Sequence, residues 1–161
     1  MLCLGEGVNE IHHYFSKQDW SIDISGRTVD MSISQLDMQQ FTLQVWDKTF
    51  AYSLRDWIAF HQAADWEAFN AIDSLGERLA ILEKKLTNHI LSMAKGIGWQ
   101  VEKPIVCKIT DLKETHKVKV KALPYNALHL SFKSNVFLPN YIGLGGKVSL
   151  GFGTVQQIIK T

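Results

Sequence analysis

Apolar residues recur at steps of three and four between residues 74 and 95, a spacing that places them on one side of an amphipathic helix. Ser74 and Glu77 form a capping-box pair at its beginning, in which the serine hydroxyl accepts from the Glu77 amide. Lys95 lies in the last turn, and Gly96 supplies the left-handed conformation that ends such a helix. The pattern predicts one long helix whose apolar side packs against another apolar surface.

Alternation of apolar and polar residues, which is typical of half-buried strands, occupies much of the remaining chain. Before the long helix it extends from residue 20 to residue 46, interrupted by candidate turns at Gly26-Arg27 and at residues 37–39. After the helix it predicts about four strands joined by hairpins, with an edge or bulge at Pro104 and a turn at residues 123–126. The four runs are residues 99–112, 118–123, 127–138 and 148–159.

Shorter segments complete the pattern. Residues 2–4 predict a strand fragment, and a short helix follows from Asn9, as its N-cap, to about Lys17. Residues 52–71 predict helical or irregular structure whose aromatic side chains pack in the core or at an interface; these are Trp57, Phe60, Trp66 and Phe69. Because a helix must cover an apolar sheet face, the second half predicts an α+β fold of the ferredoxin-like type, with a boundary near residues 34–38.

Composition limits the classes of function. The 161 residues include 46% hydrophobic and 20% charged residues, enough for a sizeable core. Cys3 and Cys107 are the only cysteines, which excludes a disulfide framework and a cysteine zinc site. There is no apolar run of about 20 residues and no basic, apolar leader, so we expect a cytoplasmic protein without a membrane partner.

The charge is uneven, although the whole chain carries only +1. Residues 1–99 have eight basic and thirteen acidic side chains, or −5, whereas residues 100–161 have nine lysines and three acidic side chains, or +6. Clustered cations favour a polyanionic partner, because counterions are released when phosphates bind. The alternative is that these lysines protect the outer face of a sheet from edge pairing.

Glycine is concentrated near the C-terminus, at positions 143, 145, 146, 151 and 153, with Lys147 between them. Dense glycine lets backbone amides approach an anion closely, and Lys147 adds a positive charge. A tight bend with no ligand explains the same pattern equally well. Neither the phosphate-loop pattern nor the dinucleotide fingerprint is present, so we predict no nucleotide cofactor.

Four segments in order resemble the CRISPR repeat-processing endoribonucleases of the RAMP superfamily. NVFLPNYIGLGGKVSLGFGTV is similar to the glycine-rich C-terminal signature of that family. GEGVNEI, YSLRDWIAF and LTNHILSMAKGIGW resemble its first-domain turn, the segment before its central helix and the end of that helix. The resemblance implies two ferredoxin-like domains. These are a partial N-terminal one, residues 1–36, and a C-terminal one with the glycine-rich loop, residues 37–161.

The resemblance also implies an activity: metal-independent cleavage of precursor CRISPR RNA, in which a base, often histidine, activates a ribose hydroxyl and leaves a cyclic phosphate. The candidate catalytic residues are His12, His13 and Tyr14 on the first short helix. The candidate RNA-binding residues are lysines and the glycine-rich loop, with no metal and no cofactor; they are Lys117, Lys119, Lys121, Lys133, Gly143, Gly145, Gly146, Lys147, Ser149, Gly151 and Gly153.

The other histidines have different expected roles. His61 and His89 are predicted to have structural roles, and His89 is expected in the core with its hydrogen-bonding groups paired. His116 is expected at a hairpin turn among lysines, as a weak RNA contact, and His129 on the face opposite Leu128 and Leu130. No histidines and carboxylates stand at metal-ligand spacing.

Two alternatives remain. Family members carry several dozen residues before the segment that resembles GEGVNEI, including a strand and a histidine, whereas here Met1 lies four residues before Gly5. An RNA-binding or assembly subunit without cleavage therefore stays open, as does a protein-interaction domain that docks through its aromatic residues. The expected partners are CRISPR repeat RNA, a CRISPR effector complex, and a second copy that covers an exposed sheet edge.

Overall fold

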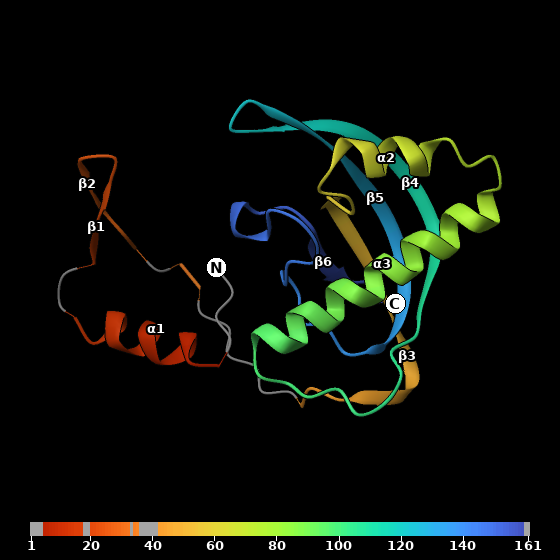
Figure 1. The fold of residues 1–161 in the computed structure, drawn as a ribbon. Helices are drawn as coiled ribbons and strands as arrows, with labels where there is room; N and C mark the ends of the chain where they lie inside the picture. Colours follow the sequence, from red (N-terminus) through yellow and green to blue (C-terminus); the bar gives the residue numbers. More distant parts are fainter. Residues whose placement is uncertain (1–4, 18–19, 33, 36–41, 160–161) are drawn as a thin grey trace. The chain divides into compact units, whose positions relative to one another are not determined.

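The computed structural model describes residues 5–17, 20–32, 34–35 and 42–159, and the chain divides into two compact units, Met1–Thr42 and Leu43–Thr161 (Figure 1). The predicted strand at residues 2–4 and the predicted boundary between residues 36 and 37 lie outside the described residues. Within the described part of the chain, every helix is too short or too polar to cross a membrane.

The first unit contains helix α1 (Gly7–Phe15) and a hairpin of strands β1 (Ser21–Ile24) and β2 (Arg27–Asp30). The hairpin turns at Ser25 and Gly26, whose φ angles of 54° and 77° suit the right-handed twist of paired strands. The prediction of Asn9 as N-cap is wrong, because α1 begins before it. The side-chain amide of Asn9 instead donates to the carboxylate of Glu6, at 3.1 Å.

The second unit is an α+β sandwich. Strand β3 (Val45–Trp57) is followed by helices α2 (Ala63–Asn70) and α3 (Leu75–Gly96). The hairpin of β4 (Cys107–Val120) and β5 (Leu123–Val136), a short 3-10 turn η1 (Val148–Leu150) and strand β6 (Thr154–Gln157) complete it. The strands pair antiparallel in the order β4-β5-β3-β6, which is the ferredoxin-like order and confirms the predicted fold class.

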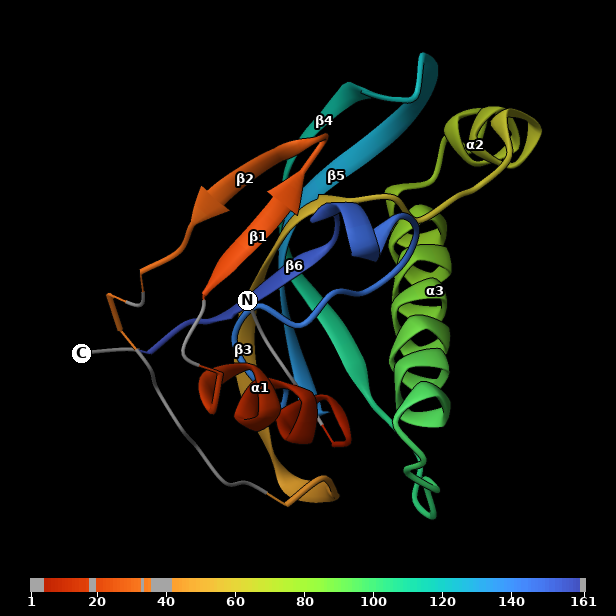
Figure 2. The same ribbon diagram turned by 90° about the vertical axis from the view of Figure 1, so that its left-hand side faces the viewer.

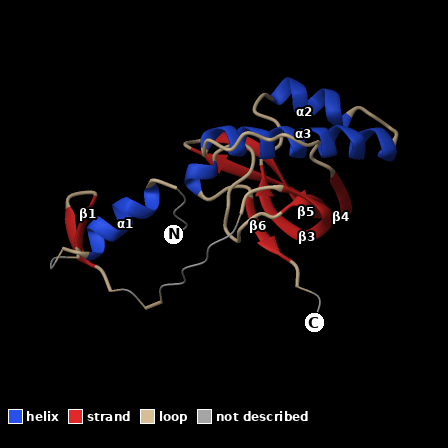
Figure 3. Ribbon diagram, turned by 90° about the horizontal axis from the view of Figure 1, so that it is seen from below, coloured by secondary structure: helices blue, strands red, loops and turns tan. Residues whose placement is uncertain are grey.

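One face of this sheet is covered by α3, and α2 lies on the same side, farther from the strands (Figures 2 and 3). The long helix buries Leu82, Leu86 and Ile90, and β5 buries Leu128, Leu130 and Phe132, which point to the same face of the strand. Burial of such side chains removes apolar surface from water and holds the helix on the sheet. The face of the sheet opposite α3 therefore receives the alternate residues of β5, among them His129.

The ends of α3 agree with the capping pattern in part. Ser74 Oγ accepts a hydrogen bond from the Glu77 amide at 3.3 Å, as predicted. The prediction that Gly96 forms the left-handed stop is wrong, because Gly96 is the last helical residue and Gly98 has φ of 74°. The Trp99 amide then donates to the Ala94 carbonyl at 2.8 Å and closes the helix end.

Several predicted strand boundaries are also wrong. Residues 52–57 belong to β3, in which Tyr52 and Leu54 bury alternate side chains and Trp57 is buried after a shift in register. The predicted separate strands at 99–112 and 118–123 are one strand, β4. The β4–β5 hairpin turns at Lys121 and Ala122, with φ of 47° and 67°, rather than at residues 123–126. Two successive left-handed residues make a tight turn without the glycine or asparagine that usually marks one, so the sequence carries no clear signal for it.

Candidate functional site

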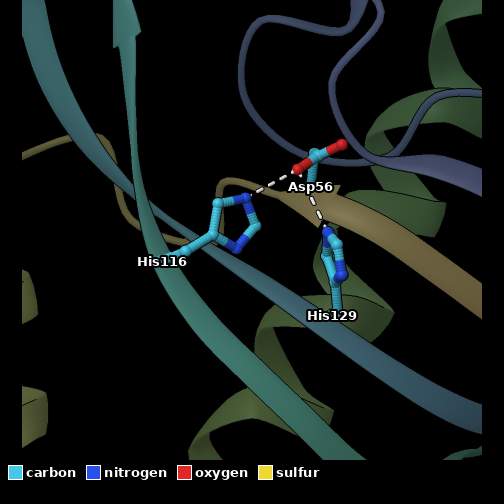
Figure 4. A group of neighbouring side chains, drawn as sticks. All are labelled: Asp56, His116 and His129. Atoms are coloured by element: carbon cyan, nitrogen blue, oxygen red, sulfur yellow. Dashed lines mark hydrogen bonds and ion pairs between the residues drawn. The ribbon is translucent and has the colours of Figure 1, made fainter.

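Three side chains from three adjacent strands meet at the end of β3: Asp56, His116 of β4 and His129 of β5 (Figure 4). Asp56 Oδ1 lies 2.8 Å from His116 Nε2 and 3.1 Å from His129 Nε2. The two imidazole rings stand nearly perpendicular, with centroids 4.7 Å apart. A single carboxylate oxygen thus accepts a hydrogen bond from each of the two histidines. We call these three residues the Asp-His-His cluster.

The backbone of β3 brings Asp56 into this position. The pairing of β3 with β5 shifts between Leu54 and Trp57, which marks a bulge, and Asp56 has φ of 51°. Aspartate tolerates this left-handed conformation better than most residues, and a bulge re-aims the side chain that it carries. The Asp56 carbonyl accepts from the Gly153 amide at 3.0 Å, so the bulge also holds the glycine-rich segment.

The β4–β5 register supplies the two histidines. His116 pairs with Ala127 and Glu114 with His129, so His116 and His129 are diagonal neighbours on one face of the hairpin. The prediction that His116 lies at a hairpin turn is wrong, because β4 continues to Val120. Glu114 Oε2 lies 3.8 Å from His129 Nδ1 and faces the second nitrogen of that ring.

The cluster sets the protonation of its carboxylate. Burial would raise the pKa of Asp56, but hydrogen bonds from His129 and His116 and the charges of both rings outweigh burial and lower it. The side chains of the three residues are 42%, 29% and 30% exposed, in the order Asp56, His116 and His129, so water and ions reach them. Asp56 is therefore an anion held by two imidazoles at the molecular surface.

A hollow of about 400 Å³ opens beside the cluster. Arg55 and Lys113 contribute two cationic side chains to it, and its lining consists of Ser53, Arg55, Asp56, Lys113, His129 and Leu130. A surface with this composition suits an anionic group such as a phosphate. His116 Nδ1 is buried without a hydrogen-bond partner, so the polar contact of this ring is the one that Nε2 makes with Asp56.

The nitrogen and oxygen atoms of the cluster converge rather than face outward. One donor atom from each residue lies within 4.8 Å of the others, a separation that a metal ion can bridge. Because both Nε2 atoms point at Asp56, neither histidine presents that nitrogen to a substrate while these hydrogen bonds persist. The geometry is that of a chelating group more than that of a general acid facing a general base.

The glycine-rich segment packs closely against the residues that follow Asp56. A Cβ on Gly145, which has φ of 93°, would lie 2.7 Å from Trp57 Nε1. The Gly146 amide donates to the Ile58 carbonyl at 3.0 Å, and a Cβ there would lie 2.8 Å from His61 Cε1. Tight packing thus accounts for Gly145 and Gly146, whereas Gly151 faces open space; contact of this segment with RNA stays a prediction.

The predicted RNA-binding lysines lie in different places. Lys147 has φ of 60°, and its Nζ lies 5.4 Å from the Tyr125 ring centroid, beside the β4–β5 hairpin. Lys133 is exposed on the same face of β5 as His129. Val118 pairs with Tyr125 and so lies on the same face of the hairpin as His129. Lys117 and Lys119, on either side of Val118 in the strand, therefore lie on the other face. Lys121 lies in the turn.

The predicted catalytic residues lie in the first unit. His12 and His13 are exposed in the last turn of α1. The Tyr14 hydroxyl donates a hydrogen bond to the Trp20 carbonyl at 2.9 Å, so its hydrogen is already used within the first unit. Their catalytic role stays a prediction.

Sequence reasoning missed the Asp-His-His cluster together with Arg55 and Lys113. His116 and His129 are 60 and 73 positions away from Asp56, so no sequence spacing connects the three residues. Arg55 and Asp56 stand inside YSLRDWIAF, a segment whose resemblance to the family assigns neither of them a role. His89 behaves as predicted, since its Nδ1 accepts from Trp57 Nε1 at 3.1 Å.

Comparison with known proteins gives a consistent result. The sequence model of one family, described as the Cas6b C-terminal domain, matches residues 44–158. An uncharacterized protein of Methanocaldococcus jannaschii is 33% identical over 102 residues, which cover 63% of this chain and 67% of that protein.

Solved structures agree with the family match. A crystal structure of Cas6b has a TM-score of 0.80 at 28% identity, covering 96% of this chain and 70% of that one. A crystal structure of the CRISPR RNA processing endoribonuclease Cas6b has a TM-score of 0.70 at 29% identity, covering 92% and 71%. Csf5, a type IV CRISPR-Cas Cas6 crRNA endonuclease, shares the fold alone, with a TM-score of 0.55 at 11% identity and coverage of 73% and 48%.

Proposed function

The chain belongs to the family of the Cas6b C-terminal domain, and from this premise we propose that it binds CRISPR repeat RNA and takes part in processing the precursor transcript. The observation that carries the proposal is the likeness of 96% of the chain to a Cas6b structure, at a TM-score of 0.80. A second similar structure is that of a CRISPR RNA processing endoribonuclease.

Cationic side chains near the cluster support RNA binding. Arg55 and Lys113 line the hollow beside Asp56, and Lys133 is exposed on the same sheet face as His129. Each contact between such a side chain and an RNA phosphate increases the binding affinity, because counterions are released, and added salt reduces this increase. Lys147 extends this set toward the hairpin, where its ammonium group lies over Tyr125. Lys117, Lys119 and Lys121 provide a second group of cations on the other side of the hairpin and at its turn.

For cleavage, the candidate bases are His12 and His13. Both are exposed on α1, so a ribose hydroxyl can reach them. A histidine that accepts the 2′ proton would let this oxygen attack the neighbouring phosphorus, with a cyclic phosphate on one product and a free 5′ hydroxyl on the other. No metal takes part in this step.

The experiment uses end-labelled repeat RNA incubated with the chain in excess and with EDTA. We expect one major cut with a cyclic phosphate end, and its loss in a variant carrying both His12→Asn and His13→Asn. The matched control is His61→Asn, because His61 is also exposed but lies after β3. Full single-turnover cleavage by the double variant would exclude both histidines.

The alternative is an RNA-binding subunit without cleavage. In the Asp-His-His cluster both imidazole Nε2 atoms are already engaged by Asp56, so the cluster supplies no base to a substrate and cleavage depends on residues outside it. In the same experiment this alternative predicts a shifted but intact RNA. A second copy of the chain or a CRISPR effector complex is the proposed protein partner, and light scattering of the free chain tests the first of these.

A further inference from the structure

We propose that Asp56, His116 and His129 form a binding site for one divalent transition-metal ion of the zinc, cobalt and nickel class. The site goes beyond RNA binding and does not depend on it. It departs from the expectation of no metal drawn from sequence spacing, because the fold unites residues that the sequence separates.

The donor atoms are of the right kind and number. Two imidazole nitrogens and one carboxylate oxygen are the ligands that these ions prefer, and three protein ligands leave one position for water. In a tetrahedral site with metal–ligand distances of about 2.0–2.2 Å, neighbouring donor atoms lie about 3.3–3.6 Å apart. The observed separations from Asp56 Oδ1 are 2.8 and 3.1 Å, so a slight outward movement of the side chains admits the ion.

The framework holds the three donors before an ion arrives. Asp56, His116 and His129 come from three neighbouring strands that hydrogen bond to one another in the order β4-β5-β3. Without metal, the carboxylate accepts from both rings. Metal binding would replace these hydrogen bonds, with each ring keeping its proton on Nδ1 and presenting the Nε2 lone pair to the ion.

A second carboxylate supports the assignment. Glu114 Oε2 faces His129 Nδ1 at 3.8 Å, the position from which a carboxylate commonly orients a metal-binding histidine. In the metal-bound form the Nδ1 proton would be directed to Glu114 and the Nε2 lone pair of His129 to the ion. This arrangement suits a metal ligand better than a general base, because the lone pair points into the cluster rather than toward the hollow.

The strained backbone at Asp56 gives the site a structural consequence. Asp56 is held at φ of 51°, and its carbonyl accepts from the Gly153 amide at 3.0 Å. An ion on the Asp56 side chain would fix the bulge and, through this hydrogen bond, the end of the glycine-rich segment. The metal would act as a clamp that joins β3, the β4–β5 hairpin and the segment before β6.

The test titrates the full chain, free of any affinity tag and previously treated with EDTA, with Co²⁺ and then with Zn²⁺. We expect one equivalent of Co²⁺ to produce a saturable visible absorption, which Zn²⁺ displaces, and a higher midpoint of thermal unfolding with Zn²⁺. Asp56→Asn and His129→Asn, each checked for folding by circular dichroism, should weaken binding about tenfold or more.

Controls separate this site from other histidines. His61→Asn and the double variant His12→Asn, His13→Asn should bind Co²⁺ with unchanged affinity. Absence of saturable binding by the unmodified chain would overturn the proposal without reference to any variant. Loss of binding in the double variant, with binding retained in His129→Asn, would place the ion on α1 and overturn it as well.

Discussion

His89 should make the stability of the second unit depend on pH in the mildly acidic range. Its ring lies on α3 against Trp57, and its Nδ1 accepts from the indole N–H at 3.1 Å. Burial, followed by the positive charges of His61 and Lys85, lowers the pKa of His89 from 6.5 to about 4. The folded chain therefore keeps this ring neutral at a pH where the unfolded chain protonates it.

The sign and size follow from this difference. Because the unfolded state binds the proton more tightly, the contribution of His89 is fully present above pH 6.5 and is lost as the pH falls toward about 4. Each pKa unit corresponds to about 1.4 kcal/mol. Between pH 7 and pH 5, His89 alone should lower the free energy of unfolding by about 2 kcal/mol.

The assay is urea unfolding, followed by far-ultraviolet circular dichroism at pH 7 and pH 5, of the unmodified chain and of His89→Asn. Asparagine keeps an amide oxygen near the position of Nδ1 for the Trp57 indole but does not titrate. The loss between the two pH values should be about 2 kcal/mol smaller in His89→Asn, and almost unchanged in the control His13→Asn, whose exposed ring lies on α1. An equal loss in His89→Asn and the unmodified chain would refute the reasoning.

Four further substitutions test other parts of the account. Ser74→Ala should cost about 1 kcal/mol in urea unfolding, because the Glu77 amide loses its cap, whereas Ser74→Asp should not. Gly151→Ala should cost about 1–2 kcal/mol from its φ of 90° alone. Gly153→Ala should cost at least about 1 kcal/mol more by the same measurement, because its Cβ would also collide with the Leu144 carbonyl. Lys147→Gln should weaken binding of repeat RNA and lower the slope of log affinity against log salt by about one contact, in a filter-binding assay where the exposed Lys84→Gln on α3 leaves both unchanged.

The sequence predicts the fold where local signals agree with tertiary packing. The three- and four-residue spacing around Leu82 and Leu86 predicts α3 because the same side chains form the core. Alternation predicts β5 for the same reason. The position of the β4–β5 turn was predicted incorrectly, because Lys121 and Ala122 adopt left-handed conformations that neither residue favours by itself.

The candidate site was far less predictable. The Asp-His-His cluster depends on strand register and on a bulge at Asp56, and both are properties of the assembled sheet. The resemblance to a family assigns RNA binding to the glycine-rich signature. In the structure, its glycines at positions 145, 146 and 153 pack closely against neighbouring atoms of the protein. Lys147 is the member of that signature whose exposed charge is available to a ligand.

The most direct test of the central proposal is a binding competition between CRISPR repeat RNA and a scrambled RNA of equal length. Fluorescence anisotropy of a labelled repeat, measured with the full chain at two salt concentrations in EDTA, reports both affinity and its electrostatic part. The account predicts that unlabelled repeat RNA competes about tenfold or more better than scrambled RNA, and that affinity falls with salt. Equal competition by the two RNAs, or no binding of either, would contradict it.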